Sequence, residues 1–217
     1  MKRTYLIVLL LSISFASFAQ EYRFGIFADP QFSWLKTDNN KLNSDGVRTN
    51  FNVGMVMEKY FAKRYAFLSG VSLSGLGGQL TYKEPVTIST ADSLYHLAAG
   101  TGVMYKLQYL DVPIGLKFCT NEIGYFTYYA HIGFTGHILV RSRVDIDKAG
   151  VSDENVKDEV NFFTASYQIG AGAEYSLGGS AALQLGVTYS NGIIDVLKSS
   201  QYNAVNSCVS IRVGIMF

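Results

Sequence analysis

The sequence predicts an all-β fold: an eight-stranded antiparallel up-and-down transmembrane β-barrel with short periplasmic turns and long extracellular loops. Three observations lead to this prediction. An export signal begins the chain, eight later segments alternate apolar and polar residues, and the connections between them are alternately short and long. The composition agrees, since 48% of the 217 residues are apolar and 16% are charged, with a formal net charge of +1. These values disfavour disorder and give no electrostatic reason to expect a nucleic-acid partner.

The first 19 residues have the form of a secretory signal peptide. Lys2 and Arg3 give it a positive start, an apolar run of about eleven residues follows, and Ser17-Phe18-Ala19 is a small-x-small cleavage site. We therefore expect a signal peptide at 1–19 and an outer-membrane β-barrel domain at 20–217; the alternative is an uncleaved anchor. After Gln20, no apolar stretch approaches the ~20 residues of a membrane-spanning helix.

Eight segments place apolar residues at every second position, which is the period of a β-strand. In the first of them, Tyr22, Phe24 and Ile26 share one face, whereas Arg23 and Gly25 share the other. None of the eight apolar faces carries a charged residue. A soluble barrel or sandwich would show the same alternation, so the period alone does not distinguish the two. The segments are 22–34, 50–58, 65–74, 109–118, 126–140, 163–175, 183–190 and 205–217.

Three features favour an apolar face that meets lipid. The polar face is rich in glycine, which weakens a water-facing strand but leaves room inside a narrow barrel. Aromatic residues gather at both ends of the segments, as in the two girdles of a membrane barrel. Short connections near 62–64, 120–124 and 177–180 alternate with long ones at 36–48, 83–104, 141–160 and 191–204. We therefore expect the bacterial outer membrane as the location.

Two segments resemble sequences of known outer-membrane barrels. The last nine residues, from Val209 to Phe217, resemble the C-terminal strand signal that such barrels present to their insertion machinery, with Phe217 as the assembly signal. The run from Tyr109 to Phe118 resembles a recurrent strand of the PorT-like outer-membrane β-barrel family, and the length and eight-strand plan fit that family. The founding type of this family is linked to a protein secretion system, so the resemblance implies a possible role in secretion or surface assembly.

The polar face carries charged residues that would point into the lumen. An eight-stranded barrel is just wide enough for its own side chains, and unpaired charge there is costly. We therefore expect a structural ion-pair network, with Glu174 and Arg212 as partners; a path for protons or small ions is the alternative. The residues of the expected lumen network are Arg23, Glu58, Asp111, Lys117, Glu174 and Arg212.

The chain offers little for a metal or cofactor, and we expect neither. His131 and His137 share the inward face of one segment, but six residues of strand separate them by roughly 20 Å. Cys119 and Cys208 fall toward opposite ends of their strands, too far apart to bridge, so we expect two free thiols.

The function expected from these features is a structural or partner-binding role carried by the extracellular loops. A narrow porin-like channel and an outer-membrane lipid-modifying enzyme are the alternatives, although the outward face has no His, Asp or Glu to serve as a catalytic base. Segment 87–102 contains Leu94, Tyr95, His96 and Leu97, which would either meet a partner or pack on one another. The expected partners are outer-membrane lipid, the barrel insertion machinery and a surface or envelope protein.

Overall fold

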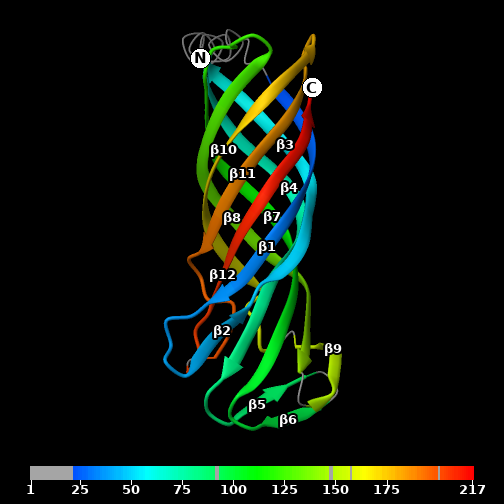
Figure 1. Cartoon of the computed structure of the whole chain (residues 1–217), viewed down its shortest axis with the longest axis vertical. Coiled ribbons are helices and arrows are strands. Elements are labelled where there is room, and N and C mark those ends of the chain that lie inside the picture. Colours follow the sequence, from blue (N-terminus) through cyan, green and yellow to red (C-terminus); the bar gives the residue numbers. More distant parts are fainter. Residues whose placement is uncertain (1–21, 91–92, 147–148, 157, 200) are drawn as a thin grey trace, which may run out of the picture.

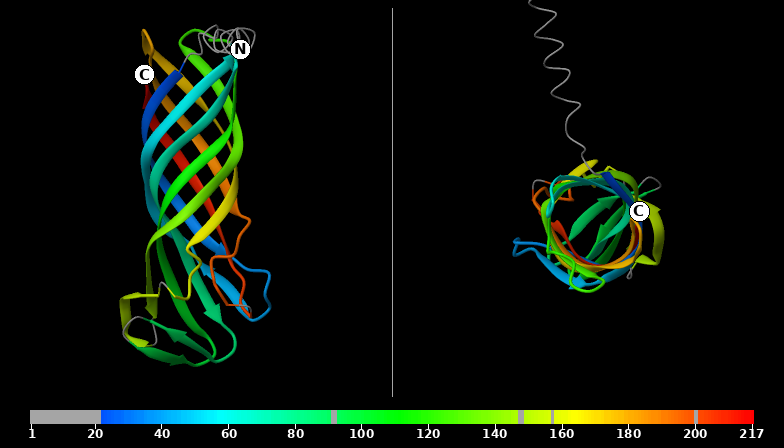
Figure 2. Two further views of the ribbon diagram at one scale, coloured as in Figure 1. Left: turned by 180° about the vertical axis from the view of Figure 1, so that it is seen from behind. Right: turned by 90° about the horizontal axis from the view of Figure 1, so that it is seen from above.

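The computed structural model describes residues 22–90, 93–146, 149–156, 158–199 and 201–217. Eight long antiparallel strands form a closed barrel (Figures 1 and 2), because β1 pairs with both β3 and β12, and β8 pairs with β10. The predicted eight-stranded barrel is thereby confirmed. The barrel strands are β1 (Tyr22–Lys36), β3 (Arg48–Ala62), β4 (Tyr65–Tyr82), β7 (Thr101–Cys119), β8 (Phe126–Ile146), β10 (Phe163–Gly178), β11 (Ala181–Gly192) and β12 (Val205–Met216).

The outer surface of the barrel is apolar, as the alternation predicted. Ile26, Met55, Ile114 and Phe134 are each about half exposed or more, whereas the polar residues between such positions are buried in the lumen. This inversion of the usual soluble arrangement fits a barrel whose surroundings are lipid tails. Among the described residues there is no helix of the length and hydropathy that a membrane crossing requires.

The two ends of the barrel differ in their connections. Three short connections join β3 to β4, β7 to β8 and β10 to β11 at the end of the barrel where β1 begins and β12 ends (Figure 1). The four long connections lie at the other, extracellular end. The expected signal peptide falls outside the described residues.

The extracellular end contains more strand than the sequence predicted. β4, β7 and β8 have 18, 19 and 21 residues, whereas a tilted strand crosses a membrane in about 9–11 residues. Four short strands complete this end: β2 (Leu42–Gly46) pairs with β4, β9 (Val151–Asn155) pairs with β8, and β5 (Val86–Ser89) pairs with β6 (Leu94–Leu97). About half of the residues in the long connections expected at 36–48, 83–104 and 141–160 therefore belong to strands.

One glycine shows why the strands can approach closely here. Gly77 in β4 has a φ of 126°, a conformation that L side chains rarely adopt, and a Cβ atom there would collide with the carbonyl oxygen of Tyr105. The β4 strand continues through this glycine to Tyr82.

Candidate functional site

A cluster of four charged side chains occupies the periplasmic end of the lumen. Lys117 donates a hydrogen bond of 2.6 Å to Glu58 and a second one to Glu174, which also accepts a 2.8 Å bond from Arg23. The Lys117 ammonium group also lies 4.6 Å from the centre of the Tyr129 ring. Two cations and two anions balance, so the cluster is neutral overall and each of its charges has an opposite partner.

A second ion pair lies further into the lumen. The Arg212 guanidinium Nε lies 2.9 Å and 3.2 Å from the two carboxylate oxygens of Asp29, and its Cζ lies 3.9 Å from the centre of the Phe27 ring. The structure does not join Arg212 to Glu174, contrary to the sequence-based expectation. The reason is the register: on β11, Gln184 lies opposite Glu174, whereas Gly186, two residues further along, lies opposite Arg212.

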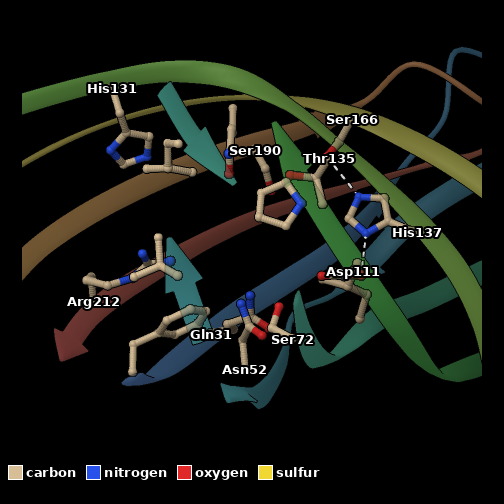
Figure 3. A pocket seen from close by; sticks show the side chains of 16 residues that line it. Gln31, Asn52, Ser72, Asp111, His131, Thr135, His137, Ser166, Ser190 and Arg212 are labelled. Carbon is tan, nitrogen blue, oxygen red and sulfur yellow. Dashed lines mark hydrogen bonds and ion pairs between the residues drawn. The ribbon is translucent and has the colours of Figure 1, made fainter. Parts of the chain in front are cut away.

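A small polar chamber lies in the lumen on the extracellular side of the Lys117 cluster, and Arg212 is among the residues that line it (Figure 3). Its volume of ≈ 50 Å³ is enough for a few water molecules. Gln31, Asn52 and His131 line it and are buried, and each has one polar side-chain atom without a protein partner among the described residues. A chamber lined by such atoms is suited to ordered water.

Three side chains on the wall of the chamber are connected in series (Figure 3). The His137 Nδ1 atom lies 2.7 Å from Asp111 Oδ1, and its Nε2 atom lies 2.8 Å from Ser166 Oγ. All three side chains are buried. In the tautomer that carries its proton on Nδ1, His137 donates a hydrogen bond to Asp111 and accepts one from the Ser166 hydroxyl at Nε2. This is the hydrogen-bond order of a serine nucleophile, a histidine base and an orienting carboxylate.

Asp111 was expected in the same network as Lys117 and Glu174. The structure instead divides the six expected residues into three groups: Arg23, Glu58, Lys117 and Glu174 in the cluster, Arg212 with Asp29, and Asp111 with His137. All of them face the lumen. The sequence pattern indicated His137 only as a candidate metal ligand and gave no sign of its two partners, which lie on the neighbouring strands β7 and β10.

The extracellular side of the chamber is closed by apolar side chains. Leu76 lines both the chamber and the apolar cluster beyond it, and the Tyr109 ring lies edge-on to His137 with centroids 5.7 Å apart. We call this cluster the head core; every long connection contributes to it. Its buried members are Leu35, Leu42, Leu76, Leu80, Tyr82, Ile88, Leu97, Val103, Tyr105, Leu107, Tyr109, Leu139, Val144, Ile146, Val151, Val156, Val160, Val196, Leu197, Ala204 and Cys208.

Segment 94–97 is divided between this core and the surface. Leu97 is 6% exposed and belongs to the head core, and Tyr95 donates a 2.7 Å hydrogen bond from its hydroxyl to Glu154. Leu94 and His96 face outward from the same strand, and Leu94 is 65% exposed. Within the run that suggested a contact surface, Leu97 therefore packs in the head core, whereas Leu94 and His96 remain exposed.

The two cysteines, the candidate metal ligands and Phe217 do not form a common site. Cys119 and Cys208 are both free thiols. Among the described residues, no group of three or more His, Cys, Asp or Glu side chains is arranged to hold a metal ion. Phe217, the expected assembly signal, exchanges backbone hydrogen bonds of 2.8 Å and 3.0 Å with Phe24 and presents its ring to the outer surface.

The closed barrel, its lipid-facing apolar surface and its filled lumen define a small bacterial outer-membrane β-barrel protein. Residues 17–198 match the family described as outer membrane protein beta-barrel domain, and the chain belongs to that family. No curated protein matches the sequence.

Several solved outer-membrane barrels have similar folds. Ail of Yersinia pestis, in complex with the heparin analogue sucrose octasulfate, is 15% identical, with 91% of this chain and 99% of Ail covered and a TM-score of 0.46. Neisserial surface protein A is 12% identical, with coverage of 89% and 95% and a TM-score of 0.49. OprG of Pseudomonas aeruginosa is also 12% identical, with coverage of 91% and 95% and a TM-score of 0.49.

Proposed function

We propose that this protein is a non-conducting barrel that holds a folded extracellular head, the part of the chain around the head core, for binding a protein partner at the cell surface. The observation that carries the proposal is the head core itself, in which all four long connections pack together on the end of the barrel. Loops held by a rigid scaffold are where binding most often resides. The PorT-like resemblance of strand 109–118 supports a partner within a secretion or surface assembly.

The contents of the lumen support the non-conducting part of the proposal. An ion entering from the periplasm would meet the Lys117 cluster, and an ion entering from outside would meet the head core. Purified barrel in planar bilayers should therefore give no steady ion conductance. Reproducible single-channel steps that persist across preparations would favour the porin-like alternative.

The binding role is tested on the outward face of β6, because deletion of segment 87–102 would remove Ile88 and Leu97 from the head core. Leu94→Asp with His96→Asp changes only exposed side chains. Cross-linking in native outer membranes should lose a partner in this variant. The control is Ile123→Asp, which alters an exposed isoleucine at a periplasmic turn. An identical partner set for the wild type and the β6 variant would contradict the proposal.

Ester hydrolysis is a second candidate function, favoured by the Asp111–His137–Ser166 series. Against it stands the chamber volume of ≈ 50 Å³, which leaves little room for a substrate. The test is incubation of the folded protein with a small fluorophosphonate. Labelling that Ser166→Ala and His137→Ala both abolish would establish a reactive serine, whereas an unlabelled protein would leave these residues a structural role.

A further inference from the structure

The outer wall of the barrel has a hollow lined by basic residues at the extracellular edge of its apolar surface. The hollow has a volume of ≈ 300 Å³ and lies over β3, β4, β7 and β8. Its charged lining residues are Arg48, Lys106, Arg141, Arg143 and Asp153. These basic residues belong neither to the ion pairs of the lumen nor to the head core, so their positive charge needs a separate explanation.

The strand register places like charges side by side in this hollow. Lys106 on β7 lies directly opposite Arg143 on β8, and Gln108 lies opposite Arg141. Like charges in directly opposite positions destabilise a sheet. Two carboxylates offset part of this charge: Asp145 pairs with Lys106, and Asp153 lies 3.3 Å from Arg143 and 3.5 Å from Arg141. Four cations against two anions leave an excess of two positive charges.

The neighbouring strand leaves the hollow open. Gly75 and Gly77 on β4 lie opposite Gln108 and Lys106, so β4 places no side chain opposite these two residues. The β3–β4 pairing ends at Asn52 and Ser74 although both strands continue. Across this gap, Arg48 donates a 2.8 Å hydrogen bond to the carbonyl oxygen of Leu76.

The position of the hollow indicates what it meets. Phe51 and Leu73 are among its lining residues, are 65% and 50% exposed, and belong to the apolar outer surface. Val140, next to Arg141, is also exposed on that surface. Moving from the periplasmic end outward, the wall therefore changes from exposed apolar residues to basic residues at the extracellular edge of the apolar surface.

We propose that this hollow binds the phosphate group of an outer-leaflet glycolipid, with the acyl chains of that lipid lying along the apolar wall below. Guanidinium and ammonium groups form strong charge-assisted hydrogen bonds with phosphate oxygens. Headgroup phosphates are held at this height by the membrane itself, so a small excess of positive charge meets them at high local concentration. An acidic protein partner would not explain why the hollow adjoins the lipid-facing surface.

The test uses the mature barrel in detergent, with native mass spectrometry and either lipid A carrying its phosphate or the same lipid after dephosphorylation. The wild type should retain one phosphorylated lipid in preference to the dephosphorylated one. Lys106→Gln with Arg143→Gln should weaken this retention about tenfold or more, since each lost charge-assisted bond alone is worth that order. The charge-conserving variant Lys106→Arg with Arg143→Lys should retain most of the binding.

The matched control is Lys41→Gln with Lys83→Gln, which removes two positive charges from the β2–β4 region further from the membrane. An equal loss in this control, or equal retention of the two lipids by the wild type, would overturn the proposal. Inorganic phosphate is the third arm. Displacement of the lipid by millimolar phosphate would assign the hollow to a free anion and not to a lipid. A mobility shift between unheated and boiled samples verifies that every variant is folded.

Discussion

Lys117 donates a 2.6 Å hydrogen bond to Glu58 inside the barrel, where the two side chains are 1% and 0% exposed. Such a pair is costly to bury and more costly to break, because removal of one partner leaves the other charge without compensation. We expect Lys117→Met to lower the free energy of unfolding by about 3–5 kcal/mol. Urea unfolding in lipid vesicles measures this. Lys63→Met, at an exposed periplasmic turn, should change stability by less than about 0.5 kcal/mol; a similar loss in both variants would contradict the argument.

The partners of Glu174 can be distinguished by double-mutant cycles. Glu174→Gln combined with Lys117→Met should show a coupling of about 0.5–3 kcal/mol, since the two side chains share a hydrogen bond. Glu174→Gln combined with Arg212→Met should be close to additive, because Arg212 pairs with Asp29. A larger coupling for the Arg212 cycle than for the Lys117 cycle would show that the ion pairs are arranged differently.

Ser166 should matter for stability even without any catalytic role. Ser166→Ala removes the 2.8 Å partner of His137 Nε2 and leaves a buried ring nitrogen without its bond. The expected cost is about 1–3 kcal/mol, unless a chamber water replaces the hydroxyl. Ser180→Ala at a periplasmic turn is the control. Unfolding midpoints in urea, with unchanged slopes, provide the comparison.

The hydroxyl groups of Tyr82 and Tyr105 lie 2.8 Å apart in the head core. Burial raises the pKa of Tyr82 to about 12 and that of Tyr105 well above its usual range. Because the folded state favours the neutral phenols, their contribution to stability is complete below about pH 10, the pKa in an unfolded chain. It is then lost as the pH rises toward 12. Limited proteolysis should show the head opening in this range while the barrel persists.

The same pair offers a matched set of variants. Tyr82→Phe leaves the Tyr105 hydroxyl buried without a partner, at a cost of about 1–3 kcal/mol, whereas the double Phe variant should be nearly neutral. The double variant should also keep its head closed to a higher pH. Tyr125→Phe, an exposed periplasmic position, should leave the alkaline transition unchanged. An alkaline transition unaffected by the double variant would place its cause elsewhere.

Phe217 should act mainly during assembly. Its backbone pairs with Phe24, but its ring is about half exposed to lipid and so contributes little to internal packing. Deletion of Phe217 should therefore lower the yield of assembled barrel in cells more than it lowers the stability of protein that has already folded. Heat-modifiable mobility of membrane fractions measures yield, and urea unfolding of purified protein measures stability. A large loss of stability with normal yield would contradict an assembly role.

The fold was predictable because the strands of a membrane β-barrel alternate apolar and polar residues, and this alternation can be recognised within each strand separately. Alternation with period two decides which residues face lipid and which face the lumen. Ile26 and Ile114 were placed outside, and Arg23 and Lys117 inside, without knowledge of strand partners. Connection length then decided which end is periplasmic.

The partners inside the lumen were not predictable in the same way. Alternation tells that Glu174 and Arg212 point inward, but their heights depend on the stagger between strands, and a shift of two residues moves a side chain by about 7 Å. That shift separates Glu174 from Arg212, and Glu174 pairs with Lys117 instead. His137 meets Asp111 because the register of β7 and β8 places the two residues directly opposite one another, and Ser166 lies on the neighbouring strand β10.

The extracellular end shows the same division. The sequence by itself determined an exported all-β chain with a lipid-facing surface, four long connections and a run of apolar residues at 94–97. Only the tertiary structure decided that Ile88 and Leu97 are buried while Leu94 remains exposed. The reason is that residues in these connections are buried by contacts between segments far apart in the sequence, and a local alternation pattern cannot indicate such contacts. In the membrane-spanning strands, by contrast, each outward-facing position meets lipid, so the alternation alone indicates its environment.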